Sequence, residues 1–89
     1  MSKCISVLGS TGSVGRQTLQ VARELGLKVA ALTAGRQIDL LEQQARQFRP
    51  CLAAVFEEEA ARALRERLKD LPIRVMSGME GLLAAAELD

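Results

Sequence analysis

Hydrophobic residues fall into two alternating patterns along this chain. Four short runs are continuously apolar, and four longer stretches carry apolar residues three and four positions apart. Continuous apolar runs are typical of strands buried on both faces of a parallel sheet, whereas the wider spacing is typical of amphipathic helices. The four expected strands are residues 4–8, 28–32, 52–56 and 73–76.

The expected helices lie between and after these strands, and each has a recognisable local signal at one end. Glycine and proline commonly end helices. Acidic residues in the first turn and basic residues in the last turn complement the helix dipole. The sequence Ser-x-x-Glu is a capping box, which is typical of a helix start. The expected helices are residues 14–25 before Gly26, residues 38–48 before Pro50, residues 58–69 with acids first and bases last, and a final helix opened by the capping box Ser77–Glu80. The expected core-facing residues of the first helix are Val14, Leu19, Val21, Ala22 and Leu25.

This alternation predicts an α/β fold with a Rossmann-like, doubly wound parallel sheet, in which right-handed crossovers give three α/β/α layers. The 89 residues suit one small domain, residues 1–89. A complete dinucleotide-binding fold has about six strands. We therefore expect a domain that is truncated after about four strands. Because aromatic residues make up only 2% of the chain, its core is expected to consist of alanine, leucine and valine.

The composition argues against several classes of protein. The net charge is +1, and no arginine-rich run is interleaved with aromatic residues, so neither a nucleic-acid nor a membrane partner is expected. No apolar stretch approaches the roughly 20 residues of a transmembrane helix, and residues 1–5 lead straight into a strand rather than forming a targeting peptide. Cys4 and Cys51 are expected to be buried, reduced thiols of a cytoplasmic protein. With no histidine and no paired cysteine spacing, no metal site is expected.

The most informative segment lies between the first strand and the first helix. Residues 9–15 have the sequence Gly-Ser-Thr-Gly-Ser-Val-Gly. In a phosphate-binding turn, Gly9 would allow the tight bend, Gly12 the close approach of a pyrophosphate, and Gly15 the close packing of helix on strand. Free N–H groups at the helix start would face the phosphates. The hydroxyls expected to add hydrogen bonds are those of Ser10, Thr11 and Ser13.

A glycine-rich turn with no ligand is the simpler alternative for this segment. A Walker-type loop is disfavoured, because no Gly-Lys-Ser/Thr sequence follows.

The turn after the second strand distinguishes between dinucleotides. NAD-binding proteins usually have an acid there for the ribose hydroxyls. Residues 32–37 contain no acid and have Arg36 instead, whose guanidinium can bind a 2′-phosphate in bidentate fashion. Gly35 would let this loop approach the adenine side closely, so NADP(H) is favoured over NAD(H). A solvated loop arginine is the alternative for Arg36, and Asp39 is interpreted as a first-turn acid of the second helix.

Three stretches, in this order, resemble the 1-deoxy-D-xylulose 5-phosphate reductoisomerases. They are residues 5–15 with Thr18 and Leu19, residues 29–36, and residues 40–45 with 48–50. Each motif is weak alone, but the ordered set is specific and runs nearly end to end. The resemblance implies that Thr11, Gly12, Ser13 and Val14 hold the NADPH phosphates and that Gly35 and Arg36 line the adenosine and 2′-phosphate site. Val14 replaces a common isoleucine, and Gln37, a poor helix cap, stands where the family usually has asparagine.

The resemblance also implies an activity for the whole enzyme. Members of this family are oxidoreductases that rearrange 1-deoxy-D-xylulose 5-phosphate with the help of Mg²⁺ or Mn²⁺. They then reduce the resulting aldehyde with NADPH to 2-C-methyl-D-erythritol 4-phosphate, a step of non-mevalonate isoprenoid biosynthesis. The whole enzymes are homodimers whose catalytic and metal-binding groups lie downstream of this region. We therefore assign no catalytic residue and no metal ligand here. The chain is expected to be an N-terminal fragment, without the catalytic and C-terminal domains, that binds NADPH and is inactive alone.

Two other interpretations remain open on the sequence. One is the NADP-binding domain of another oxidoreductase with a Thr-Gly-x-x-Gly turn, such as a semialdehyde dehydrogenase or an extended short-chain reductase. The other is a non-catalytic module that senses a nucleotide or serves assembly, because this fold hosts many functions. The ordered second and third motifs favour the reductoisomerase.

Overall fold

All eight expected elements are present in the computed structural model of the chain, which describes residues 4–87. Expectations that concern residues 1–3 and 88–89 lie outside this range. The element ends differ little from those expected, and the largest extension is in the second strand, which runs on to Ala34. The elements are β1 (Cys4–Val7), α1 (Ser13–Leu25), β2 (Lys28–Ala34), α2 (Ile38–Phe48), β3 (Leu52–Val55), α3 (Glu58–Arg67), β4 (Arg74–Ser77) and α4 (Gly78–Glu87).

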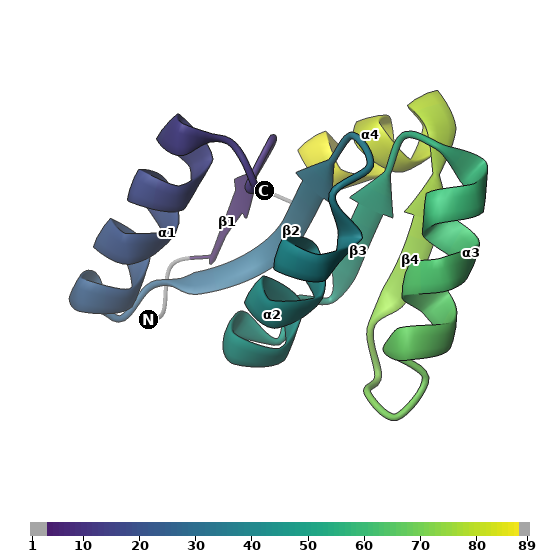
Figure 1. Cartoon of the computed structure of the whole chain (residues 1–89). Coiled ribbons are helices and arrows are strands. Elements are labelled where there is room, and N and C mark those ends of the chain that lie inside the picture. Colours follow the sequence, from purple (N-terminus) through teal and green to yellow (C-terminus); the bar gives the residue numbers. More distant parts are fainter. Residues whose placement is uncertain (1–3, 88–89) are drawn as a thin grey trace.

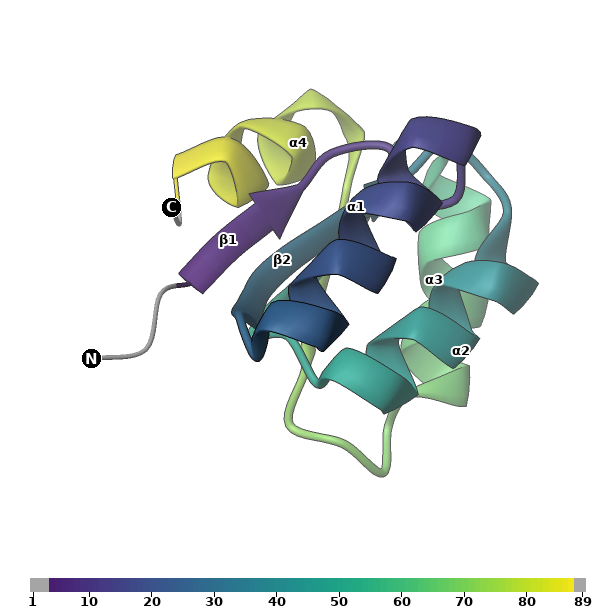
Figure 2. The same ribbon diagram turned by 90° about the vertical axis from the view of Figure 1, so that its left-hand side faces the viewer.

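The strands form one parallel sheet in the order β1-β2-β3-β4, so each strand pairs with its neighbour in sequence. Figure 1 shows α1, α2 and α3 on one side of this sheet, with α4 behind it. The turned view confirms that α4 lies across the opposite face from the other helices (Figure 2). The predicted three-layer, Rossmann-like α/β fold is therefore confirmed.

The main core lies between the sheet and the layer formed by α1, α2 and α3, and it consists of leucine, valine and alanine as expected. A smaller cluster of Ala31, Leu52 and Ala85 lies where α4 meets the other face. The strands β2 and β3 are almost wholly buried, whereas β1 and β4 are only partly buried because they form the two edges. The prediction of strands buried on both faces is thus right for the central pair and wrong for the edge strands.

Helix α1 buries only part of its expected apolar face. Leu19 and Ala22 face the core, but Val14, Val21 and Leu25 are 75%, 50% and 67% exposed. The two groups lie on adjacent sides of the helix, and only one side can face the sheet. The side with the small residues allows the closer packing, so the expectation for the three exposed residues is wrong.

The helix-end signals are confirmed except for the capping box. Gly26 ends α1 with a left-handed φ of 68°, and α3 has acids in its first turn and bases in its last. Ser77, however, is the last residue of β4, where it pairs with Val55. Among the hydrogen bonds of residues 4–87, none joins Ser77 to Glu80. The expected capping box is therefore wrong, although the helix that it announced is present.

Both cysteines are exposed, which corrects the prediction that they are buried. Cys4 begins the edge strand β1, and Cys51 lies in the connection before β3. Each stands next to apolar residues in sequence, but at a position that the helices do not cover.

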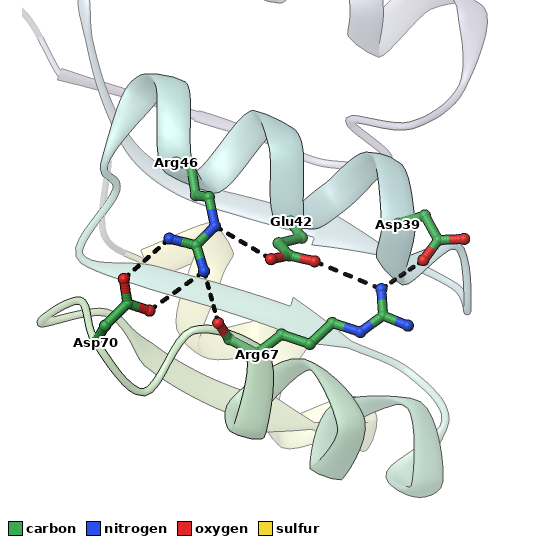
Figure 3. Close-up of polar contacts among 5 residues, drawn as sticks. All are labelled: Asp39, Glu42, Arg46, Arg67 and Asp70. Carbon is green, nitrogen blue, oxygen red and sulfur yellow. Dashed lines mark hydrogen bonds and ion pairs between the residues drawn. The ribbon is translucent and has the colours of Figure 1, made fainter.

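Five charged residues link α2 to the end of α3 and the loop beyond it (Figure 3). The guanidinium of Arg46 binds both carboxylate oxygens of Asp70, at 3.0 and 3.2 Å, and also Glu42 Oε2 at 3.1 Å. Arg67 contacts Asp39 and Glu42 on α2. The hydrogen bond from Arg46 is the main cause that lowers the pKa of Asp70 below its ordinary value of 3.8.

We expect this network to make stability depend on pH in acid. A carboxyl group with a lowered pKa in the folded protein stabilises it above pH 3.8, and this contribution is lost as the pH falls through the folded-state pKa. The difference in unfolding temperature between the wild type and Asp70→Asn should therefore shrink below pH 3.8. It should also shrink in high salt, because the groups are exposed. A difference that stays constant from neutral to strongly acidic pH would contradict this expectation.

Candidate functional site

The segment Gly9–Gly15 leads from the end of β1 into the first turn of α1, at the carboxyl edge of the sheet. Gly9 has a left-handed φ of 70°, in agreement with the tight bend expected of this glycine. Its N–H donates to Thr33 Oγ1 at 2.8 Å, and the Gly12 N–H donates to the Gly9 carbonyl at 3.1 Å. The first bond ties the turn to the end of β2, and the second closes the turn at Gly12, the N-cap of α1.

Packing within the chain requires glycine at Gly15 but not at Gly12. A Cβ atom at Gly15 would lie 2.2 Å from the carbonyl oxygen of Gly9 and 2.7 Å from Cα of Ser10, so the packing of α1 on the turn demands glycine. At Gly12 a Cβ atom would meet only the Gly9 oxygen, at an ordinary 3.5 Å. Its φ of −78° and ψ of 172° suit any residue. Packing within the described chain therefore explains Gly15 and leaves Gly12 unexplained.

The start of α1 offers unpaired hydrogen-bond donors beside Gly12. The N–H groups of Ser13, Val14 and Gly15 have no acceptor in residues 4–87, and no side chain caps the helix at Gly12. Such groups carry the positive end of the helix dipole. An open hollow of about 400 Å³ lies against them, lined by β1, the turn and Thr18. Anionic groups suit this position.

Ser10 does not face this hollow, which corrects the expectation for its hydroxyl. The residue is fully buried. Its Oγ donates to Gln44 Oε1 at 2.7 Å and lies 3.3 Å from the Thr33 carbonyl, which also accepts the Ser10 N–H at 2.8 Å. Ser10 thus has neither its N–H nor its hydroxyl free for a phosphate.

Gln44 is a residue of this site for which the sequence predicted no role. It lies on α2, is buried, and donates from Nε2 to the Ser10 carbonyl at 2.8 Å. A signal was present in the sequence. Gln44 falls within the stripe of Leu41, Ala45 and Phe48, so it is a polar residue on the face of α2 expected to contact the core.

The second expected turn lies at the same edge of the sheet, because Thr33 near the end of β2 holds both Gly9 and Ser10. Gly35, Arg36 and Gln37 follow β2 and are all exposed. Arg36 makes no ion pair with any residue of the described range.

The residues that begin α2 behave as expected. Gln37 is the N-cap of α2, and its side chain forms no capping hydrogen bond. Asp39 lies in the first turn of α2 and is ion-paired with Arg67, which confirms its interpretation as a first-turn acid.

Between residues 4 and 87, no three histidine, cysteine or acidic residues are grouped so that they could hold a metal ion. None of the helices in that range has the length and apolar character needed to cross a membrane.

Comparison with known proteins assigns the family. The family model for 1-deoxy-D-xylulose 5-phosphate reductoisomerase matches residues 5–89. The chain belongs to the 1-deoxy-D-xylulose 5-phosphate reductoisomerase family. The match decides against the other oxidoreductase families considered above.

Similar reductoisomerases are several times longer than this chain. That of Acetivibrio thermocellus is 56% identical over 84 residues, which cover 94% of this chain and 22% of the relative. That of Moorella thermoacetica is 54% identical and is matched over 100% of this chain and 24% of its own length. The chain therefore spans about a quarter of these reductoisomerases.

Solved reductoisomerases contain the same fold. The Zymomonas mobilis enzyme in complex with NADPH matches 96% of this chain with a TM-score of 0.89 and 30% identity, over 23% of that structure. A reductoisomerase in complex with NADPH, fosmidomycin and magnesium matches 93% of this chain with a TM-score of 0.86 and 29% identity, over 21% of that structure.

Proposed function

We propose that this chain is the N-terminal, NADPH-binding part of a 1-deoxy-D-xylulose 5-phosphate reductoisomerase. The observation that carries the proposal is the open side of Gly12, next to backbone N–H groups of α1 that have no acceptor in the described chain. Packing within these residues does not require glycine there, whereas a pyrophosphate lying against the backbone does. The NADPH complex of the Zymomonas mobilis relative supports the choice of ligand.

In this proposal the first turn holds the pyrophosphate. The N–H groups of Ser13 and Val14 donate to phosphate oxygens, and the helix dipole favours their negative charge. The hydroxyls of Thr11 and Ser13 add hydrogen bonds; unlike Ser10, neither residue is fully buried. Gly12 leaves the space for the phosphates. Gly9 and Gly15 shape the turn.

The second turn holds the adenosine end. Arg36 binds the 2′-phosphate, while Gly35 and Gln37 line the adenosine. The exposure of Arg36 and its lack of an ion-pair partner within residues 4–87 support this role, because no ion pair has to be broken before its guanidinium binds an anion.

We expect the chain to bind NADPH more tightly than NADH, by about 10- to 100-fold, since a hydrogen-bonded ion pair to the 2′-phosphate is worth about 1.5–3 kcal/mol. The Arg36→Gln substitution should remove most of this preference. Calorimetric titration of both cofactors measures it. Arg23→Gln, which removes an exposed arginine at the far end of α1, is the matched control and should keep the preference. Equal affinity of the wild type for the two cofactors would contradict the role of Arg36.

For the whole enzyme we propose the family reaction, in which 1-deoxy-D-xylulose 5-phosphate is rearranged and then reduced by NADPH to 2-C-methyl-D-erythritol 4-phosphate. We further propose Mg²⁺ or Mn²⁺ as the metal, a homodimer and a cytoplasmic location. When bound, NADPH supplies the hydride. This chain holds the dinucleotide at two loops, which restricts where the nicotinamide can lie and lowers the entropic cost of the reduction.

We assign no catalytic residue and no metal ligand to this chain. It binds NADPH as one part of a larger enzyme and is inactive without the remainder. We propose neither a nucleic-acid partner nor a membrane partner.

A further inference from the structure

Within residues 4–87, the buried polar residues are Ser10, Thr33 and Gln44, and they form one connected cluster directly beneath the first turn. Every side-chain hydrogen bond of this cluster joins Thr33 or Gln44 to Gly9 or Ser10. Buried polar groups of this kind rigidify the segment that they join when all their bonds are made. The cluster therefore acts on the turn proposed to bind the pyrophosphate.

We propose that Gln44 is a positioning residue for the dinucleotide phosphates: it holds the Ser10–Thr11 peptide so that the Thr11 N–H points outward from the protein. This inference rests on the proposed function of the first turn as a phosphate site. It adds a residue from α2, which lies far from the glycine motif in sequence and does not itself touch the cofactor.

The direction of the Thr11 N–H follows from the geometry of the peptide bond. In a planar trans peptide, the C=O of one residue and the N–H of the next point in opposite directions. The Ser10 carbonyl points inward, because it accepts a hydrogen bond of 2.8 Å from Gln44 Nε2. The N–H of Thr11 in the same peptide group therefore points away from Gln44, and it has no acceptor among the described residues.

Gln44 holds Ser10 at two points. Its Oε1 accepts the Ser10 hydroxyl at 2.7 Å while its Nε2 donates to the Ser10 carbonyl. On the other side, Thr33 accepts the N–H groups of Gly9 and Ser10. With bonds from both sides, the Ser10–Thr11 peptide cannot rotate without leaving a buried carbonyl unpaired, which is costly.

The position of Gln44 also joins the two nucleotide loops. Helix α2 begins directly after Arg36 and Gln37, and Gln44 lies further along the same helix. The helix therefore fixes the distance between the loop proposed for the 2′-phosphate and the turn proposed for the pyrophosphate. Groups that are already in place before the ligand arrives cost less to order on binding.

The test uses Gln44→Met in the full 89-residue chain, because methionine has a similar volume and can make neither hydrogen bond. We expect NADPH affinity to fall about tenfold, as for the loss of one well-placed hydrogen bond. Affinity for adenosine 2′-monophosphate, which has no pyrophosphate, should stay within about twofold. In ¹H–¹⁵N spectra without ligand, the Thr11 amide signal should move. Gln43→Met, an exposed neighbour on α2, should leave all three readouts unchanged.

A second pair of variants separates positioning from stability. Ser10→Ala removes the hydroxyl bond but keeps the bond from Gln44 to the Ser10 carbonyl, so it should lower the unfolding temperature yet lose less NADPH affinity than Gln44→Met. If Gln44→Met does not fold, Gln44→Leu replaces it, since leucine is also apolar and can make neither hydrogen bond. It should lose NADPH affinity to the same extent.

Unchanged NADPH affinity in Gln44→Met, or an unmoved Thr11 signal, would overturn the proposal. Parallel losses for NADPH and adenosine 2′-monophosphate would overturn it as well, because they would indicate a general loss of structure. Failure of the proposed function itself is distinguishable, since the wild-type chain would then not bind NADPH at all.

Discussion

The Gly12→Asp substitution is expected to lower the affinity for NADPH by at least about 100-fold, while the protein remains as stable as the wild type. A carboxylate at this position would stand where the phosphates are proposed to lie. Two like charges about 4 Å apart near a protein surface repel by roughly 4 kcal/mol, which corresponds to about 1000-fold in affinity. Stability should be spared, because a Cβ atom fits at Gly12 and aspartate is a preferred N-cap residue. We expect the free energy of unfolding to stay within about 0.5 kcal/mol of the wild type.

Gly12→Asn is the matched control for this variant. Asparagine has the same shape and caps a helix equally well, but it carries no charge. It should bind NADPH at least about tenfold more tightly than Gly12→Asp, although more weakly than the wild type. Titration and thermal unfolding of the three proteins provide the comparison. Wild-type affinity in Gly12→Asp would count decisively against a phosphate site at this turn.

Gly15→Ala is expected to act in the opposite way, through stability. The added Cβ atom would overlap the backbone of Gly9 and Ser10, which cannot move aside because Thr33 and Gln44 hold it. Overpacking of this kind costs about 3 kcal/mol, and the better helix propensity of alanine offsets about 1 kcal/mol. We therefore expect the free energy of unfolding, measured with denaturant, to fall by about 2 kcal/mol.

Gly35→Ala is the control for that substitution. No heavy atom lies within 4 Å of a Cβ atom at Gly35, and its φ lies outside the left-handed region. Its stability should therefore remain within about 0.5 kcal/mol of the wild type. If Gly15→Ala proved as stable as Gly35→Ala, the close contact between α1 and the turn would be refuted.

The sequence predicted the features of this fold that depend on short-range patterns. Continuous apolar runs and helical periodicity are local, so the order of the eight elements was predicted correctly. The bend at Gly9 and the helix end at Gly26 were also predictable, since both need a left-handed backbone that glycine adopts at little cost. The two candidate turns lie at one edge of the sheet because parallel strands share their direction.

Features that depend on distant residues were not predictable. The Ser10 hydroxyl turns inward because of Gln44, 34 positions away, and nothing in the glycine motif indicates this partner. On α1, two adjacent apolar sides compete for the sheet, and the contact between Gly15 and the turn decides between them. The exposure of Cys4 depends on β1 being an edge strand, and the strand order is not encoded in hydrophobic periodicity.

The strand order has a consequence for how the chain assembles during synthesis. Because every strand pairs with its predecessor in sequence, each strand that leaves the ribosome meets a partner whose edge is already formed. No earlier pair has to open to admit it. Each new strand pairing closes a loop that contains a single helix, so the entropic cost of loop closure is divided into small, similar steps. The sheet can thus grow one β–α unit at a time, with the Gly9–Gly15 turn secured as soon as β2 and α2 are in place.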